Sequence, residues 1–386
     1  MRLASAWRMP SSERLRGDRA GSNIQFMSRD SSAEIARIRL LNHHITRRPL
    51  EAPVDLVRHL GAVQAQDYLG ALWALGLRLR SATESSVEQA LAERMIVRTW
   101  PMRGTLHLVA ADDARWMLSL LAPRVLRSAA ARHRQLGLDD GVFTRAERIL
   151  TRALEGGKQL TRPAMYRLLE ADGIATSDSR GLHILGFLAH RQVLVLGTRE
   201  GRQHTFRLFE EWVPPTSART REESLAELAI RYFSSHGPAT IQDFAWWSGL
   251  TIAEVKEAIA LAGSRVISET FDGQTCWLGE NAAVSDERKH RVHLLPPFDE
   301  YTVAYRNRDA VVDPAHARRV NAGGGMLNAV IVIDGRVVGT WKRTLKKGEV
   351  LLTLEPFGRL KRDERQAIDA VADRYGAFLG MPARVT

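Results

Sequence analysis

The chain has 386 residues, of which 45% are hydrophobic and 26% charged, and this balance is typical of globular proteins with two to four folded units. Its net charge of +11 favours a polyanionic partner such as nucleic acid. The sequence excludes several classes: no apolar run suits a membrane-spanning helix or a signal peptide, and Cys276 alone cannot form an internal disulfide or a thiolate zinc site.

The first 30 residues differ from the rest of the chain. They are rich in Arg and Ser and show no apolar periodicity. We expect residues 1–30 to be either a disordered extension or a misassigned start, with the native protein beginning at Met27.

After residue 30, one arrangement of helices followed by two short strands recurs three times. The first copy, residues 31–135, carries four helical patterns, then two strand patterns, then a linking segment of one or two helices. These are expected at 33–44, 54–60, 69–79 and 87–93, at 96–100 and 104–109, and at 112–135.

The second copy spans residues 136–215. Helices are expected over 144–154, after Thr161, with Pro163 tolerated in the first turn, and from Ser179. Strands at 193–196 and 204–208 flank a turn at 199–202, where a glycine suits the turn and two arginines suit phosphates.

The third copy, residues 216–285, has the clearest signals. Thr240 and Thr251 each precede a helical pattern and are followed three residues later by an acid, as in a capping box. Strands at 265–270 and 275–278 surround Asp272-Gly273, a hairpin turn. Three helices and a β-hairpin make a winged helix, so we predict three tandem winged-helix units.

The last segment, residues 286–386, has a different pattern. Two prolines keep Leu294–Asp299 from being helical. Strands are expected on both sides of Asp334-Gly335 and at 350–354, and an amphipathic helix at 362–379. The predicted fold class is therefore α+β: three winged helices followed by a small β-rich C-terminal domain with a terminal helix.

Basic residues in three places are candidates for contacts with DNA phosphates, with a solvated charged face as the alternative. One lies in the first unit, two in the turn of the second, and four near the end of the chain. The candidates are Arg98, Arg199, Arg202, Lys342, Arg343, Lys346 and Lys347.

The segment 61–68 places Gln64, Gln66 and Asp67 between two helices. Alone, such residues are usually surface polar groups. Arg103 and His107 share one face of the following predicted hairpin, because side chains alternate along a strand. They either approach phosphate or support the glutamines, or they are buried polar residues that fix the hairpin.

Three motifs carry a resemblance to the AlkZ/YcaQ family of winged-helix DNA glycosylases. They are Val63-Gln-Ala-Gln66, Arg103-Gly-Thr-Leu-His107 and Leu294-Leu-Pro-Pro-Phe-Asp-Glu-Tyr301. The resemblance extends over almost all of the chain after residue 30. It implies a C-shaped set of winged helices around duplex DNA, with Gln64 and Gln66 as the catalytic pair.

The resemblance also locates the chain within the family. Glutamine rather than aspartate at position 66 is similar to the AlkZ branch, which is associated with bulky adducts and interstrand crosslinks. Ala65 departs from the larger aliphatic residue that is common between the two catalytic positions.

The implied reaction is hydrolysis of the N-glycosidic bond of an alkylated purine. Alkylation at N7 makes the base cationic and a good leaving group, and the sugar gains oxocarbenium character. An oriented water and a dipole facing C1′ then suffice, and an amide carbonyl can provide both. We expect Gln66 to orient the water and Gln64 to stabilise the sugar cation or support that water, or the reverse.

Asp67 is either a stronger water activator or the N-cap of the following helix. No lysine lies near the motif, which favours a monofunctional glycosylase over a lyase. We expect no metal or organic cofactor, duplex DNA with alkylated bases as partner, no membrane, a monomer, and a cytoplasmic location at the bacterial nucleoid.

The alternative function is a non-catalytic winged-helix regulator or architectural DNA-binding protein, because a fold does not determine its function. Gln64 and Gln66 discriminate between the two: a regulator has no need for this pair where DNA is held.

Overall fold

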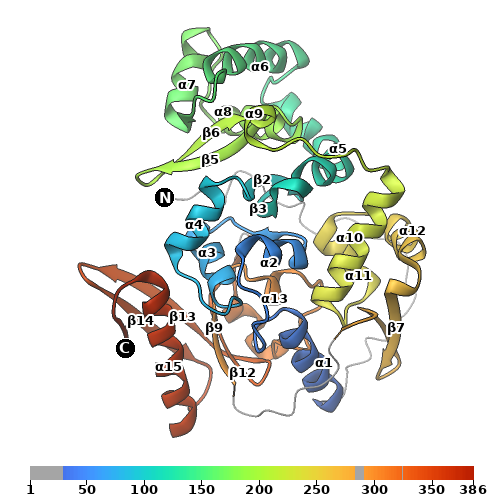
Figure 1. Cartoon of the computed structure of the whole chain (residues 1–386), viewed down its shortest axis with the longest axis vertical. Coiled ribbons are helices and arrows are strands. Elements are labelled where there is room, and N and C mark those ends of the chain that lie inside the picture. The colour runs from blue at the N-terminus through green and yellow to red at the C-terminus, as the bar shows by residue number, and fades with distance from the viewer. Residues whose placement is uncertain (1–28, 283–290, 324) are drawn as a thin grey trace.

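The computed structural model describes residues 29–282, 291–323 and 325–386. The prediction for the N-terminal extension therefore lies outside the described residues, apart from its last two positions. Helices and sheets alternate through the chain (Figure 1), which confirms the α+β class. The number of winged-helix units and the unit boundaries stay predictions.

The first segment contains the expected elements in the expected order and one unpredicted short strand, β1 (Val63–Gln64). It contains α1 (Arg29–Asn42), α2 (Pro53–Leu60), β1 (Val63–Gln64), α3 (Tyr68–Gly76), α4 (Glu84–Ala92), β2 (Ile96–Met102), β3 (Thr105–Ala110) and α5 (Ala111–Gln135). The linking segment is one helix of 25 residues that accommodates Pro123 in its interior.

The second and third segments also match their helical patterns. The second contains α6 (Asp140–Leu154), β4 (Leu160–Thr161), α7 (Arg162–Ala171), α8 (Arg180–His190), β5 (Leu194–Glu200), β6 (Gln203–Leu208) and α9 (Phe209–Trp212). The third contains α10 (Arg221–His236), α11 (Ile241–Ser248), α12 (Ile252–Ala262), β7 (Val266–Phe271) and β8 (Gln274–Gly279). Thr240 and Thr251 both form the capping boxes predicted for them.

One sheet joins the first two segments. Its strand order is β1-β3-β2-β5-β6-β4, and β2 meets β5 where Arg98 lies opposite Leu196. The hairpins of these two segments are thus halves of a single six-stranded sheet, which connects the middle of the molecule to the lobe that carries α6 and α7 (Figure 1).

The C-terminal segment has its own five-stranded sheet in the order β15-β14-β13-β12-β9. Its elements are β9 (Val292–Leu295), α13 (Glu300–Val303), α14 (Ala317–Val320), β10 (Asn321–Gly323), β11 (Met326–Leu327), β12 (Val330–Ile333), β13 (Arg336–Lys346), β14 (Glu349–Pro356), α15 (Arg362–Leu379) and β15 (Ala383–Val385). The terminal helix has the bounds that its apolar periodicity predicts.

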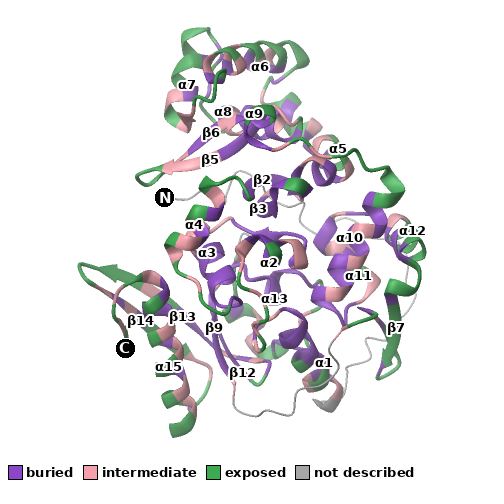
Figure 2. Ribbon diagram, viewed as in Figure 1, coloured by how far each residue is buried: buried purple, intermediate pink, exposed green. Residues whose placement is uncertain are grey.

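The C-terminal segment shares its hydrophobic core with α1–α4 of the first segment. The Trp73 indole donates to the Leu294 carbonyl at 2.8 Å, and Arg78 forms a fully buried bidentate ion pair with Asp299. Figure 2 shows the buried residues concentrated where these elements meet. Segment 294–301 is thereby held against the helices that flank the glutamines.

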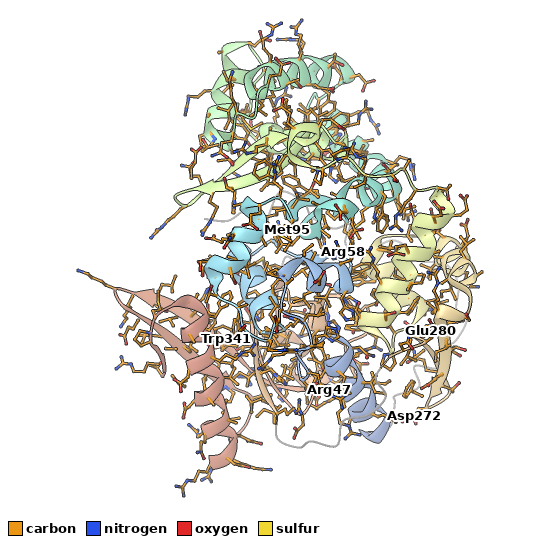
Figure 3. All side chains as sticks on the ribbon, in the orientation of Figure 1. Arg47, Arg58, Met95, Asp272, Glu280 and Trp341 are labelled. Atoms are coloured by element: carbon orange, nitrogen blue, oxygen red, sulfur yellow. The ribbon has the colours of Figure 1, made fainter. Side chains whose placement is uncertain are left out.

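Trp341 belongs to this core. It is buried, its indole donates to the Leu295 carbonyl at 2.9 Å, and it lies at the base of the β13–β14 hairpin (Figure 3). None of the helices in the described ranges is long and apolar enough to cross a membrane.

Candidate active site

The glutamine loop (residues 61–68) begins in the short strand β1, at the edge of the six-stranded sheet. Gln64 lies opposite His107 in antiparallel register with β3, and the Ala65 amide donates to the Leu106 carbonyl at 2.7 Å. This pairing brings the motif Gln64-Ala-Gln66 beside the Arg103–His107 motif, two regions that the sequence analysis could only propose as neighbours.

Both glutamine carbonyls accept hydrogen bonds from the protein. Gln64 is buried, with 6% of its surface exposed, and its Oε1 accepts from Arg103 Nη2 at 3.2 Å. Gln66 is half-buried, and its Oε1 accepts from the Leu106 amide at 3.1 Å. Among the described residues neither side-chain NH₂ group has a protein acceptor, so both remain available to a substrate or a water.

Arg103 and His107 form one unit with Gln64. Arg103 Nη2 lies 3.2 Å from His107 Nε2, and His107 Nδ1 lies 2.9 Å from the Thr105 carbonyl. Burial and the charge of Arg103 lower the pKa of His107 to about 3. The ring is therefore neutral, with its Nδ1–H donating to Thr105 and its Nε2 accepting from Arg103.

Glu300 lies beneath the glutamine loop and is a residue that the sequence analysis missed. Its Oε1 accepts from the Gln64 backbone amide at 2.7 Å, and its Oε2 accepts from the Trp247 indole at 2.9 Å. Burial alone would raise the pKa of Glu300, but His236 and the charge of Arg103 lower it below its usual value. The motif 294–301 contains this residue, yet its local pattern gives no sign of such a contact.

The structure corrects the prediction that Arg98 contacts DNA. Its side chain is buried, with Nε and Nη2 donating to the Ala65 carbonyl at 3.1 and 2.7 Å, and Nη1 lies 2.8 Å from His204 Nε2. A guanidinium enclosed in this way cannot reach a phosphate, and it supports the backbone between the two glutamines instead.

Asp67 and Arg343 meet although 276 residues separate them. Arg343 Nη2 lies 3.4 Å from Asp67 Oδ1, and its Nη1 donates to the Tyr375 hydroxyl at 2.9 Å. Asp67 occupies the N-cap position of α3, but its side chain makes no capping hydrogen bond. The C-terminal sheet thus reaches the end of the glutamine loop through Arg343.

This geometry is consistent with what comparisons with known proteins reveal. The family model described as DNA glycosylase AlkZ-like matches residues 57–378. The chain belongs to the AlkZ-like DNA glycosylase family. A curated relative, the interstrand DNA cross-link repair glycosylase of Streptomyces sahachiroi, is 28% identical, and the alignment covers 90% of this chain and 97% of that protein.

A solved structure agrees with the family assignment. The Streptomyces sahachiroi DNA glycosylase AlkZ superposes with a TM-score of 0.75 at 25% identity, covering 92% of this chain and 99% of that one. Membership of an AlkZ-like glycosylase family favours an enzyme over the non-catalytic regulator considered from the sequence.

In this AlkZ-like chain, Arg103 also borders a large basic cavity of about 1220 Å³. The cavity is lined by seven arginines and a single acidic residue, Glu254. Most of the arginines come from α5, where Arg124 and Arg127 are exposed. The cavity therefore connects Arg103, which donates to Gln64, with a surface suited to phosphates.

The remaining basic candidates lie on two hairpins. The β5–β6 and β13–β14 hairpins project on the same side of the molecule, with α3 and α4 between them (Figure 1). Arg202, Lys346 and Lys347 are exposed at the two tips. Arg199 is occupied by an ion pair with Glu88, and Lys342 by one with Glu355 at 2.7 Å.

Proposed function

We propose that this protein hydrolyses the N-glycosidic bond of purines carrying a cationic N7 alkyl group in duplex DNA, including bases tied in an interstrand crosslink. Gln64 and Gln66 are the catalytic pair. The observation that carries the proposal is their placement: each of the two neutral amides is fixed by a protein donor, and the donor to Gln64, Arg103, lines a cavity rich in arginines.

The chemistry follows from neutral amides. The C1′–N9 bond breaks with its electron pair going to the base, which leaves as a neutral alkylated purine. Water adds to C1′ and loses a proton to solvent. An amide is too weak a base to take that proton early, so the site suits substrates whose base already carries a positive charge.

The proposed hydrolysis proceeds without a covalent intermediate between the protein and the sugar. No lysine occurs before Lys158 in the sequence, so the glutamine loop and its hairpin offer no amine for a Schiff base at C1′. This supports a monofunctional glycosylase, for which borohydride should trap no protein–DNA adduct. We also propose that it acts as a monomer, in the cytoplasm, at the nucleoid.

The basic residues have separate roles in this proposal. Arg124 and Arg127 on α5 line the cavity beside the site and contact phosphates of the duplex. Arg202, Lys346 and Lys347 extend these contacts from the hairpin tips. Because such contacts carry no sequence information, the enzyme would select a lesion by its charge rather than by its sequence context.

The test is base release from N7-methylated duplex DNA, followed by chromatography of free 7-methylguanine. We expect release by the native protein and a strong loss in the Gln64→Ala/Gln66→Ala double variant. Gln274→Ala, which alters an exposed glutamine on β8, is the matched control. Tight duplex binding by the native protein without any base release would instead support a regulator.

A second assay addresses the crosslink. A duplex joined through two N7-alkylated guanines migrates slowly on a denaturing gel and yields single strands once one glycosidic bond is cut. Release of 7-methylguanine without separation of the crosslinked strands would restrict the proposal to monoadducts.

A further inference from the structure

Arg103 occupies a position where its side chain decides the orientation of Gln64. A guanidinium has only donors, so the Gln64 atom 3.2 Å from Arg103 Nη2 must be the carbonyl oxygen. The reverse orientation would place two donors in contact. The NH₂ group of Gln64 therefore points away from Arg103.

The second hydrogen of Arg103 Nη2 is also committed. It meets His107 Nε2, which is held as an acceptor because the ring donates from Nδ1 to the Thr105 carbonyl. Arg103 thus lies between two fixed acceptors, and Gln64 cannot rotate its amide without breaking this arrangement.

The backbone at Arg103 supports a role for its side chain. Arg103 and Gly104 have φ values of 56° and 69°, as in a two-residue hairpin turn that strongly favours Asn, Asp or Gly. A long side chain in the left-handed region is unfavourable. The turn itself gives no reason for arginine, whereas the contact with Gln64 does.

The charge of Arg103 affects the two glutamines differently. Gln64 Oε1 accepts from a cation, which withdraws electron density from that oxygen and makes it a poor partner for a developing sugar cation. Gln66 Oε1 accepts from the neutral Leu106 amide and keeps a second lone pair. The two glutamines are therefore not equivalent, and Gln66 has the better acceptor oxygen.

We propose that Arg103 is a positioning residue that fixes Gln64 with its NH₂ group toward the attacking water, so that Gln64 donates to this water and Gln66 accepts from it. The inference rests on the proposed function and assigns the two roles that the sequence left open. One lone pair of the water binds Gln64, the other attacks C1′, and one of its hydrogens binds Gln66.

Glu300 completes the arrangement by balancing charge. A cation near a sugar that becomes positive would slow the reaction. The carboxylate of Glu300 is buried and binds the Gln64 backbone amide, and electrostatic attraction links it to Arg103. Arg103 can therefore orient Gln64 without leaving a net positive charge at the site.

The first experiment is a double-mutant cycle in single-turnover base release, using Arg103→Met, Gln64→Ala and both together. We expect Arg103→Met to slow release by roughly tenfold or more, and the double variant to be no slower than Gln64→Ala, because Arg103 acts through Gln64. Duplex affinity should change by less than about threefold. The inference would be overturned if the rate losses of the two single variants multiplied in the double variant, or if Arg103→Met lowered only duplex affinity.

Arg103→Lys keeps a charge and donors, and it provides a variant that preserves the fold if Arg103→Met lowers the melting temperature. We expect it to recover part of the rate. If Arg103→Lys also released base faster than Arg103→Met when both carry Gln64→Ala, Arg103 would not act through Gln64.

The second experiment compares Gln64→Glu with Gln66→Glu. Glutamate at 64 retains the acceptor for Arg103 but removes the NH₂ donor, so we expect it to be as slow as Gln64→Ala. Glutamate at 66 retains the acceptor for water and should remain active. If Gln64→Glu is as fast as the native protein, the assigned roles are wrong. If the native protein itself releases no base, the proposed function fails first, and the inference with it.

Discussion

The glutamine loop and the tip of the β13–β14 hairpin both belong to the proposed DNA-facing side, yet they are built in opposite ways. Gln64 is bonded to Arg103 and Glu300, which lie 39 and 236 positions away in the chain. Lys346 and Lys347 at the hairpin tip are exposed and make no ion pair within the described residues. One region is fixed by buried polar contacts, and the other presents exposed charge.

The difference indicates a division of labour. Buried hydrogen bonds to ions fix geometry and are costly to break. Exposed charges are screened by salt and contribute mainly to encounter and affinity. Changes around the glutamine loop should therefore alter the rate of base release, and changes at the hairpin tip should alter DNA affinity.

Replacing Glu300 with glutamine should have the largest effect. The substitution keeps the shape but removes the charge that balances Arg103, and its NH₂ group must face either the Gln64 amide or the Trp247 indole, both donors. We expect about 100-fold slower base release, roughly 2–3 kcal/mol lower stability, and unchanged duplex affinity.

Single-turnover kinetics, thermal melting and fluorescence anisotropy would measure these three quantities. Glu280→Gln, at an exposed position (Figure 3), is the matched control and should behave as the native protein. Native-like turnover by Glu300→Gln would show that the glutamine loop does not depend on the carboxylate.

Arg98→Met provides a second test of the difference between the glutamine loop and the hairpin tip. Methionine retains much of the apolar stem but leaves the buried Ala65 carbonyl without the donors at 2.7 and 3.1 Å. We expect about 3 kcal/mol lower stability, about tenfold slower release, and no loss of duplex affinity. Arg202→Met, at an exposed site, should lower duplex affinity and leave stability and the rate of base release unchanged. If Arg98→Met weakened DNA binding, Arg98 would have the DNA-binding role predicted from the sequence.

Arg98 also shows how far the sequence could lead. Some helix bounds were predictable because caps and periodicity are local, as Thr240, Thr251 and the helix over 362–379 confirm. Others shifted: the helices expected at 33–44 and 69–79 are Arg29–Asn42 and Tyr68–Gly76. What covers the face of a strand depends on distant segments: the Arg98 side chain on β2 is enclosed by the Ala65 carbonyl and by His204 of β6. An arginine on an alternating strand looks the same from sequence whether it meets DNA or a backbone carbonyl.

The same limit applies to the candidate site. The motifs around Gln64 and Arg103 were recognisable as short patterns, and their contact was one of the alternatives that the sequence left open. Glu300 was not recognisable, because its partners Gln64, Trp247 and His236 lie 236, 53 and 64 positions away. Local patterns identify which residues are unusual, whereas the fold determines which of them meet.

Lys346→Ala/Lys347→Ala should lower affinity and leave chemistry intact. Each lost phosphate contact reduces the slope of log affinity against log salt by about 0.9, so the double variant should lose up to roughly two units of slope. Saturating enzyme should restore the native rate. Lys342→Ala should lower affinity less, because the Lys342 ammonium already pairs with Glu355 at 2.7 Å. A slower rate of base release by the double variant at saturating enzyme would contradict the assignment of the hairpin tip to affinity alone.

His293→Leu should have the smallest effect at neutral pH, because its effect on stability appears only in acid. Burial, reinforced by nearby arginines, lowers the pKa of His293 to about 3, so the folded state resists a proton that the unfolded chain accepts near its ordinary pKa of about 6.5. Stability from this neutral histidine is complete above pH 6.5 and is lost as the pH falls toward 3.

The variant should therefore lose less stability than the native protein between pH 6.5 and 4, by up to about 1.4 kcal/mol per pH unit. Denaturant unfolding across this range would measure it, with the same two proteins at pH 8 as the control for packing. No hydrogen bond among the described residues joins the His293 side chain to the glutamine loop, so base release at pH 8 should stay native. Parallel stability curves for the two proteins would mean that His293 accepts a proton in the folded state as readily as in the unfolded chain.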